Sequence, residues 1–187
     1  MQQIEAVELG KSYLLLNHGP VTLVSSASNG RSNVMAASWA MPLDFSPAKV
    51  AVVIDRNTLT RELIEASGEF VLNIPTRAMA AQVLMAGSCS GRDEDKFAAA
   101  RLNVLSSEQV GAPSVEGCAA WLECRVIPEA HNQKSYDLFI GEVVAARADA
   151  RLFSDGRWHF DDDALRTIHY LAGGNFIATG DPFVLDK

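Results

Sequence analysis

The sequence predicts a mainly β fold, a closed or partly closed antiparallel barrel with peripheral helices. Segments that read as strands outnumber those that read as helices, and the helices fall between strands as insertions. A doubly wound α/β fold would instead alternate strand and helix along the whole chain. The 187 residues, 48% hydrophobic and 21% charged, fit one globular domain of ordinary size. Because no repeat, low-complexity tract or linker divides them, we expect a single domain over residues 1–187.

The first half of the chain is expected to form strands separated by turns. Residues 13–16 are short and apolar, and residues 21–25 are β-branched and strand-like. Residues 28–31, Ser-Asn-Gly-Arg, have the composition of a hairpin turn, so the segment 33–40 should pair back on the preceding strand. Residues 50–54 form a nearly continuous apolar run, which is typical of a strand buried on both faces.

Three helices are predicted between the strands. They cover residues 57–66, a segment that begins after Thr76, and roughly residues 93–100. Either Asn57 or Thr58 can cap the first helix, because both side chains accept hydrogen bonds from free N–H groups at a helix start. In the second helix, Met79, Val83 and Leu84 share a face and are expected to be buried.

The second half of the chain returns to strand. Residues 119–127 and 137–146 are long enough to pair as neighbours, with residues 132–135 as the loop between them. Cys118 and Cys124 begin and end a strand-like segment, and six residues of strand span about 20 Å, too far for a disulfide. Their even spacing predicts two small core residues on one face of the sheet, with a redox or metal role as the alternative.

The overall composition excludes several classes of partner. The net charge of −7 argues against nucleic acid, whose phosphates are bound by clustered Lys and Arg. No apolar run approaches the roughly 18 residues that cross a bilayer, so no membrane partner is expected. The odd count of three cysteines suits a reducing compartment. The first five residues lack the layout of a secretion signal, and we therefore expect a cytoplasmic protein.

Residues 33–39, Asn-Val-Met-Ala-Ala-Ser-Trp, followed by residues 42–47, are the most informative segment for function. Small, neutral side chains in its middle leave the backbone N–H and C=O groups of a strand edge open to a ligand. A flat heterocycle with its own donors and acceptors, such as a flavin, can be bound by those groups, and Trp39 adds a large apolar surface. Alone, the segment indicates a strand and a tight turn. Together with the segments that follow it, it indicates a site for flavin mononucleotide (FMN).

Two downstream segments could bind a phosphate. Residues 55–58, Asp-Arg-Asn-Thr, come directly off the apolar strand and open a helix, whose N-terminal amides and dipole favour an anion. The alternative is a capped helix with a solvated arginine. Residues 87–97 are rich in small residues and place Arg92 and Lys96 four apart. Their alternative is a mobile loop whose cations pair with the acidic residues 93–95.

Other kinds of site find little support in the sequence. Neither a P-loop nor a dinucleotide-binding glycine fingerprint is present, and the histidines and cysteines lack the spacing of a metal site. A nucleophile pair of Cys89 with a remote histidine is not favoured. Among the histidine segments, only His169 and Tyr170, which precede a pair of glycines, are expected near a ligand.

Seven segments, in order, together match one known family. They are residues 33–39 with Pro47, 56–58, 69–73, 90–97, 122–124, 139–143 and 169–174. On these segments the chain resembles the flavin reductase-like, FMN-binding split-barrel proteins, and among them the flavoredoxin-type branch. The match runs from about Tyr13 to Gly180, and the ordered set is more specific than any one of its members.

The resemblance implies a homodimer of split β-barrels, each copy holding FMN noncovalently near the subunit interface. It implies that the backbone of residues 35–39 and 41–43 borders the isoalloxazine ring, and that residues 56–58 hold the phosphate and ribityl chain. Ser90 and Lys96 would assist, and Tyr170 would lie near the ring. The residues implied at the cofactor are Asn33, Met35, Ala36, Ala37, Ser38, Trp39, Met41, Pro42, Leu43, Arg56, Asn57, Thr58, Ser90, Lys96, Tyr136 and Tyr170.

One position departs from the family pattern. The family often has Gly-Asp-His before the segment 139–143, with the histidine near the flavin, whereas here residues 134–136 are Lys-Ser-Tyr. The phenol of Tyr136 is bulkier and neutral near pH 7, whereas an imidazole can take up a proton. The contact with the flavin at this position, and the electron donor, therefore stay open.

The predicted function is an FMN-dependent oxidoreductase that passes electrons from NADH or NADPH through the bound flavin to a small-molecule acceptor. No catalytic side chain is predicted, because the hydride step needs no acid or base from the protein. The alternatives are a flavoredoxin-type electron carrier that takes electrons from a partner protein, and a non-enzymatic ligand-binding barrel. A split barrel for haem or pyridoxal phosphate is the remotest alternative. The sequence leaves the preferred nicotinamide and the final acceptor open.

Overall fold

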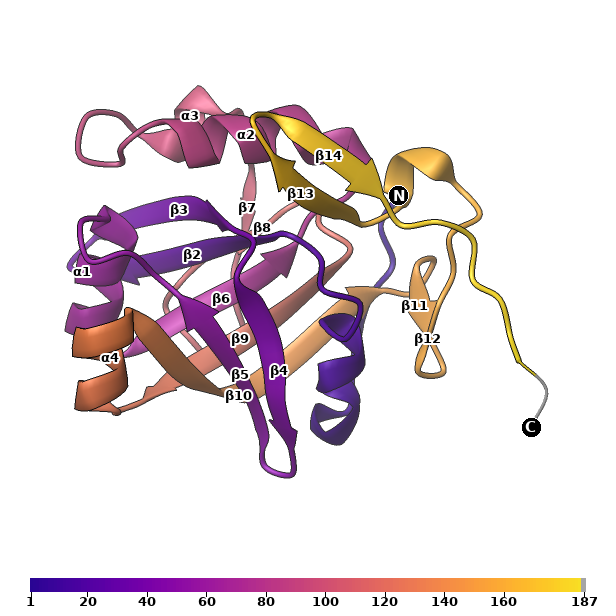
Figure 1. Ribbon diagram of the computed structural model, residues 1–187, viewed down its shortest axis with the longest axis horizontal. Coiled ribbons are helices and arrows are strands. Elements are labelled where there is room, and N and C mark those ends of the chain that lie inside the picture. The colour runs from indigo at the N-terminus through magenta and orange to yellow at the C-terminus, as the bar shows by residue number, and fades with distance from the viewer. Residues whose placement is uncertain (186–187) are drawn as a thin grey trace.

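The computed structural model describes residues 1–185, and its main feature is one antiparallel sheet of eight strands (Figure 1). The strands of this sheet are β1 (Ile4–Ala6), β2 (Thr22–Ser28), β3 (Arg31–Ala37), β4 (Ala40–Phe45), β5 (Ala48–Val53), β6 (Glu69–Ile74), β9 (Ala120–Ile127) and β10 (Leu138–Asp149). Short antiparallel pairs outside it are β7 (Val104–Leu105) with β8 (Ser114–Val115), β11 (Phe153–Ser154) with β12 (Arg157–Trp158), and β13 (Ile168–Ala172) with β14 (Asn175–Ala178).

Helices connect the strands. The α-helices are α1 (Leu59–Ser67), α2 (Ala80–Ser88), α3 (Lys96–Ala99) and α4 (Ala130–Tyr136), and the 3-10 helices are η1 (Leu9–Leu15), η2 (Arg77–Met79) and η3 (Asp163–Leu165). Within residues 1–185, none of the helices has both the length and the apolar character that crossing a bilayer requires.

The order of strands makes the sheet curl into a split barrel. Hydrogen-bonded neighbours run in the order β3-β2-β6-β9-β10-β5-β4, with β1 added on β10. The two edges are therefore β3 and β4, although only Ser38 and Trp39 separate these strands along the chain. Because the three Cα–Cα steps across that connection span at most about 11 Å, the two edges must meet there. The predicted mainly β, partly closed barrel is confirmed.

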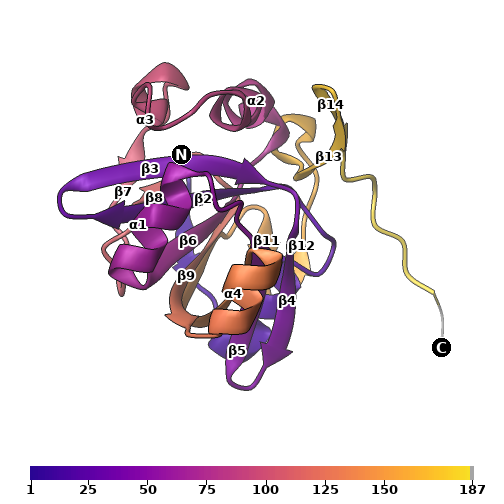
Figure 2. The same ribbon diagram turned by 60° about the vertical axis from the view of Figure 1, so that its left-hand side comes forward.

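Two apolar clusters lie on either side of the barrel wall, because successive side chains of a strand point to opposite faces. On β2, Val24 belongs to the inner cluster and Leu23 to the outer one. On β9, Leu122 belongs to the inner cluster and Trp121 to the outer one. Helices α2 and α3 cover the outer cluster, and Figures 1 and 2 show them lying over β2 and β3. The strands at the centre of the wall are therefore buried on both faces.

Several local predictions are confirmed. Asn29 and Gly30 take positive φ angles of 50° and 76° in the turn between β2 and β3, which is the requirement of a type I′ hairpin. Thr58, and not Asn57, caps α1, since its hydroxyl oxygen accepts a hydrogen bond from the backbone N–H of Arg61 at 3.2 Å. The apolar run 50–54 forms most of β5 and is buried as expected.

Other local predictions are wrong. Residues 13–16 form no strand but lie in and just after η1, where Leu15 and Leu16 pack into the inner cluster. A run of four apolar residues does not distinguish a strand from one helical turn. The expected loop 132–135 lies within α4, whose polar sequence has no apolar stripe to predict a helix. The third predicted helix is shorter than expected, with four residues in α3.

Two expectations about burial are also wrong. Leu84 of α2 is 40% exposed, whereas Met79 and Val83 are buried. Cys118 and Cys124 belong to the outer and the inner cluster, respectively, and so do not share a face. The strand begins only at Ala120, so its alternation does not extend back to Cys118. Both cysteines are buried and free, as expected of small core residues.

Gly141 on β10 offers a test of packing inside the barrel. A Cβ atom there would lie 2.6 Å from Cζ of Phe70 and 3.0 Å from Cβ of Cys124. We expect Gly141→Ala to lower the free energy of unfolding, measured by urea denaturation, by about 1–3 kcal/mol, because an overpacked core must shift its neighbours. Gly180→Ala is the control, since a Cβ there meets no atom within 4 Å. Equal stability of the two variants would contradict the packing described.

Candidate functional site

A small, largely apolar cavity opens beside the end of β3. Its volume is about 150 Å³, and it lies between residues 36–38, the second half of α2 and the β13–β14 hairpin. Helix α2 approaches β3 closely because Gly87 has no side chain: a Cβ atom would lie 3.3 Å from Cβ of Ala36. The cavity thus brings the predicted residues 36–38 together with the predicted Tyr170.

Helix α2 and β14 line this cavity with residues that the sequence analysis did not assign to a ring site, although two of them, Gly87 and Ser88, begin the segment 87–97 proposed for phosphate. They are Val83, Leu84, Gly87, Ser88 and Phe176. Leu84 is exposed because it borders the cavity instead of the core, and Phe176 packs against Tyr170 with ring centroids 5.1 Å apart. The apolar part of this wall could not be recognised from the sequence, because an apolar residue in a helix is assigned to the core until the packing of the helix is known.

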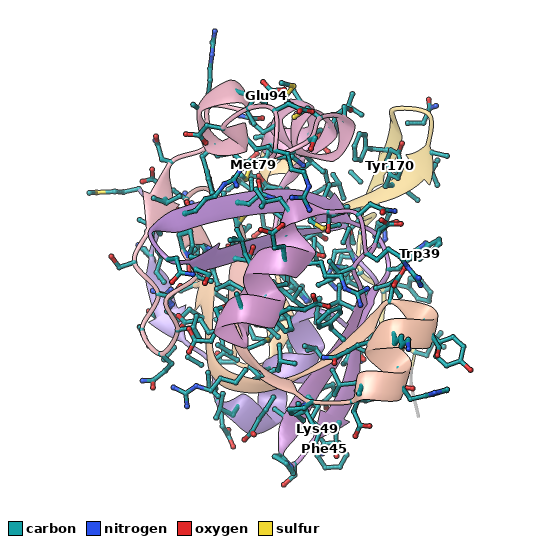
Figure 3. The ribbon with its side chains drawn as sticks, turned by 90° about the vertical axis from the view of Figure 1, so that its left-hand side faces the viewer. Trp39, Phe45, Lys49, Met79, Glu94 and Tyr170 are labelled. Atoms are coloured by element: carbon teal, nitrogen blue, oxygen red, sulfur yellow. The ribbon has the colours of Figure 1, made fainter. Side chains whose placement is uncertain are left out.

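A row of exposed apolar side chains leads from the cavity along β4. Trp39 is 72% exposed, Met41 55% and Leu43 48%, while Pro42 between the last two is half-buried. Figure 3 shows Trp39 on the same side of the protein as the hairpin that carries Tyr170. Trp39 and Met41 are two residues apart and precede the bulge of β4 between Pro42 and Asp44, so they share one face and a flat ligand beside Trp39 would meet Met41.

The start of α1 is the second part of the candidate site. The hydroxyl of Thr58 donates to the carbonyl oxygen of Asp55 at 2.8 Å, and the backbone N–H of Asn57 donates to the Asp55 carboxylate at 2.7 Å. Arg56 is exposed, and its Nη2 lies 3.3 Å from Oδ1 of Asp137. A cation beside a helix N-terminus attracts an anion such as a phosphate.

The cavity and the start of α1 lie on either side of residues 38–39. The carbonyl of Trp39 accepts a hydrogen bond from the N–H of Val53 at 3.0 Å. The next residue, Ile54, donates its N–H to the carbonyl of Asp137 at 2.8 Å, which brings the end of α4 to the same place. Arg56 follows two residues later. Residues 36–39 therefore adjoin both the cavity, through residues 36–38, and the segment that leads to Arg56, through Trp39.

Arg61 ties α1 and α4 together behind Arg56. It is 8% exposed, with Nη1 at 2.6 Å from Oδ1 of Asp137 and Nη2 donating to the carbonyl of Gln133 at 2.8 Å. Its guanidinium carbon lies 5.2 Å from the ring centroid of Phe139. Burial by itself raises the pKa of Asp137, but the hydrogen bond from Arg61 and the charge of Arg56 outweigh it, so this pKa lies below its usual value. Asp137 is therefore anionic at neutral pH and holds both arginines.

The segment 90–96 is attached to β3 and α1. Gly91 lies so close to Asn33 that a Cβ atom would overlap the Asn33 side chain. Asn33 is buried, and its Nδ2 donates to Oγ1 of Thr60 on α1 at 2.8 Å. Arg92 pairs with Glu62 on the same helix at 2.8 Å. Gly91 and Arg92 thus contact Asn33 and the first turn of α1, the helix that residues 55–58 precede.

Arg92 and Lys96, which the sequence offered either as an anion clamp or as part of a mobile loop, contact different partners in the structure. Lys96 is buried, and its Nζ donates to the carbonyl of Ala86 near the end of α2 at 2.7 Å. Burial lowers the pKa of Lys96. Ser90 is exposed, and its hydroxyl oxygen accepts a hydrogen bond from the N–H of Arg92 at 3.2 Å.

Tyr136 is the last residue of α4 and is 62% exposed, with its ring edge-on to His131 at a centroid distance of 5.5 Å. It precedes Asp137, so the phenol belongs to the element that reaches Arg56. His169 was the other residue expected near a ligand. Its Nδ1 lies 2.9 Å from the carbonyl oxygen of Gly19, a contact that holds the β13–β14 hairpin, and His169 does not line the cavity.

A larger cavity, of about 390 Å³, lies elsewhere, next to η2. It contains none of the predicted site residues, and two of its charged residues, Asp149 and Arg151, pair with each other at 2.6 Å. Size alone therefore does not identify the site. Over the part of the chain that the structure describes, no group of three or more His, Cys, Asp and Glu is placed to bind a metal ion.

The role of Arg61 in holding α1 against α4 can be tested by Arg61→Met. The variant leaves Asp137 without its closest partner in a partly buried position. We expect its Tm, measured by circular dichroism, to fall by about 5 °C or more. Arg92→Met is the matched control, since the pair of Arg92 with Glu62 is exposed, and its Tm should fall by about 2 °C or less. Similar Tm values for the two variants would refute this role.

Comparison with known proteins identifies the family. The family model described as "Flavin reductase like domain" matches residues 15–168. The chain is 47% identical over 183 residues to the uncharacterized protein YddH of Escherichia coli (strain K12), covering 96% of this chain and 97% of that one.

Solved structures with the same fold include an FMN-binding domain and a flavoredoxin. An FMN-binding domain of a flavin reductase-like enzyme from Shewanella baltica OS155 is 48% identical, with a TM-score of 0.97 over 99% of this chain and 98% of the other. Flavoredoxin of Desulfovibrio vulgaris (Miyazaki F) is 28% identical, with a TM-score of 0.78 over 89% and 90%. The chain belongs to the flavin reductase-like split-barrel family.

Proposed function

We propose that this chain, as one flavin reductase-like domain, binds FMN noncovalently and passes electrons from NADH or NADPH through the flavin to a small-molecule acceptor. The observation that carries the proposal is that residues 36–38 line a cavity, while the next residue, Trp39, is hydrogen-bonded through its backbone to Val53, three residues before Arg56 at the start of α1. A flat heterocyclic ring linked to a phosphate requires a surface for the ring and a cation for the phosphate close to each other. Membership of the family supports the same cofactor.

The ring side of the proposed site consists of β3 and the start of β4. The cavity of about 150 Å³ is smaller than typical ligand pockets, which measure roughly 300–1,000 Å³, and would enclose only one edge of the ring. The backbone of residues 36–39 would supply hydrogen-bonding groups, with apolar contact from Met41, Pro42 and Leu43. Met35 packs on the inner cluster and would contribute through its backbone.

The phosphate side consists of Arg56, Asn57, Thr58 and the amides at the start of α1. Arg56 is held by Asp137, whose charge Arg61 offsets, so its guanidinium is kept near the helix start. Asn33, Ser90 and Lys96 belong to the proposed site through the segment 90–96, which packs on β3 and α1. Of the residues on this side, Arg56, Asn57 and Ser90 are exposed and therefore accessible to a phosphate.

FMN, when bound, supplies hydride and electron transfer. The residues of the chain position the ring, and the apolar wall of Leu84, Tyr170 and Phe176 keeps water from one edge of it. Tyr136 offers a neutral hydroxyl where the family often has an imidazole. No side chain is proposed as a proton donor in the hydride step.

We further propose a cytoplasmic homodimer with each flavin near the subunit interface. The 72% exposure of Trp39 supports a partner surface, because so large an apolar side chain is rarely left in water without function. The three cysteines are free, which supports a reducing compartment.

Substitution at the start of α1 tests the phosphate assignment. We expect Arg56→Ala combined with Thr58→Ala to raise the Kd for FMN by about 100-fold, since two hydrogen bonds to a charged group are lost. Fluorescence titration with FMN and with riboflavin, which lacks the phosphate but keeps the ribityl chain, provides the readout, and riboflavin affinity should fall much less than FMN affinity. Arg157→Ala, an exposed arginine on β12, is the matched control. An unchanged Kd for FMN in the double variant would remove these residues from the site.

The electron donor is tested by an anaerobic absorbance spectrum of the purified protein before and after NADH or NADPH is added. Flavin bands that bleach promptly are expected and would establish the reductase activity. Bands that persist would favour an electron carrier, an alternative supported by the structural similarity to flavoredoxin. A colourless protein that also fails to bind added FMN would refute the proposed function and favour a barrel without cofactor.

A further inference from the structure

The β13–β14 hairpin supplies two aromatic side chains to the wall of the candidate cavity and lies beside α2, outside the eight-stranded sheet (Figure 1). Backbone hydrogen bonds join the start of this hairpin to the rest of the protein. The N–H of Val21 donates to the carbonyl of Ile168 at 2.9 Å. The N–H of Arg77 donates to the carbonyl of Arg166 at 2.7 Å. The shape of the cavity therefore depends on what holds the hairpin in place.

Four side chains form a continuous network of hydrogen bonds at the base of the hairpin, the His–Thr network. Nε2 of His18, in the turn before β2, lies 2.8 Å from Oγ1 of Thr167. Oγ1 of Thr167 lies 2.7 Å from Oγ1 of Thr179, which lies 3.3 Å from Nε2 of His169. Nδ1 of His169 lies 2.9 Å from the carbonyl oxygen of Gly19. The network thus leaves the turn at His18, passes both ends of the hairpin and returns to the turn at Gly19.

The carbonyl of Gly19 fixes the direction of these hydrogen bonds, because a carbonyl oxygen only accepts. Nδ1 of His169 must therefore carry a proton, and Nε2 of the neutral ring accepts from the hydroxyl of Thr179. Each threonine hydroxyl has one hydrogen to donate, so Thr179 accepts from Thr167, and Thr167 accepts from His18. His18 is therefore a neutral ring that donates from Nε2.

The other ring nitrogen of His18, Nδ1, is buried and has no hydrogen-bond partner within residues 1–185. Aromatic rings surround it: the His18 centroid lies 5.0 Å from that of Trp158 and 6.5 Å from that of Phe160. A proton on Nδ1 would place a charged donor where no acceptor is available, which costs free energy. Burial, together with the neighbouring His169, lowers the pKa of His18 to about 4.

No carboxylate offsets a proton on His18, since this residue forms no ion pair within the part of the chain that the structure describes. His169 faces it with ring centroids 5.9 Å apart, and a positive charge on His169 would repel a second one. Arg157 and Asp161, which flank the two aromatic residues, are exposed. The other charged or titratable groups on the surrounding elements contact partners of their own, namely Glu8 with Lys11, Arg166 with Asp163 and Asp181, and His159 with Ser154.

We infer that His18 is a positioning residue whose neutral ring holds the β13–β14 hairpin against the candidate cavity through the His–Thr network, and that mild acid releases the hairpin. Release exposes His18 to water, where its ring takes up a proton. The stabilisation is complete above the ordinary histidine pKa of about 6.5 and is lost as the pH falls from there to about 4. Its consequence for flavin rests on the proposed function, because the same hairpin lines the proposed ring side.

Amide exchange of the full-length protein as purified, followed by NMR, tests the release. The N–H of Val21 reports on the attachment of the hairpin, since it donates to Ile168. We expect its opening constant, corrected for intrinsic exchange, to rise about 30-fold from about pH 7.5 to about pH 5, because only the open form binds the proton readily. The N–H of Leu72, in a strand paired on both sides, should exchange more slowly than that of Val21 at both pH values.

Three variants separate the role of His18 from a general effect of acid. His18→Gln keeps an N–H donor but does not titrate, so its opening constant at Val21 should change less than about 3-fold between the two pH values. Thr167→Val removes the acceptor of His18 at nearly constant shape and should raise the opening constant about 10-fold at neutral pH. His159→Gln, which replaces a histidine outside the network, is the matched control and should keep the full pH dependence.

An opening constant that does not change with pH in the unmodified protein would overturn the inference. Full pH dependence in His18→Gln would also overturn it, as would an unchanged opening constant in Thr167→Val or equal exchange at Val21 and Leu72. The proposed function is tested separately, because none of these measurements uses added flavin. Failure to bind FMN would refute that function and leave the amide exchange unchanged.

Discussion

The two-residue connection between β3 and β4 is the constraint on which the rest of the structure depends. These strands are consecutive along the chain but stand at opposite edges of the sheet. A flat sheet would separate them by the width of the whole sheet, so the sheet must curl until its edges meet at Ser38 and Trp39. The hydrogen bond from Val53 to the carbonyl of Trp39 fixes the junction. Barrel closure and the position of the split therefore have one cause.

The candidate site lies at that junction for the same reason. Where two sheet edges meet, backbone groups are not all used in ladders, and small side chains such as those of residues 36–38 leave them accessible. Helix α2 approaches this point because Gly87 faces Ala36, and the approach creates the apolar cavity. On the other side of Trp39, Arg61 neutralises Asp137 and so stabilises a cluster of charges near the start of α1. Closure thus brings an apolar and a cationic environment to one surface.

Much of the fold could be predicted from the sequence because its signals are local. The Asn29–Gly30 turn, the cap at Thr58 and the apolar run of β5 each follow from the chemistry of a few adjacent residues. Predictions failed where local patterns are ambiguous, as in the short apolar run that forms η1 and the polar run that forms α4. The position of the cavity could be predicted only on the β3 side, since the wall supplied by α2 and β14 depends on packing between distant segments.

The sequence by itself determined the class of fold, the strand and helix that carry the candidate site, and the family, because alternation, capping residues and ordered motifs are properties of neighbouring residues. Only the tertiary structure decided which of the candidate residues meet. In the folded chain, Asn33 donates a hydrogen bond to Thr60 and packs against Gly91. Lys96 donates to the carbonyl of Ala86, and Trp39 is exposed to solvent. The physical reason is that burial and contact are set by the curl of the sheet and by helices packing on it, over separations along the chain that no local pattern encodes.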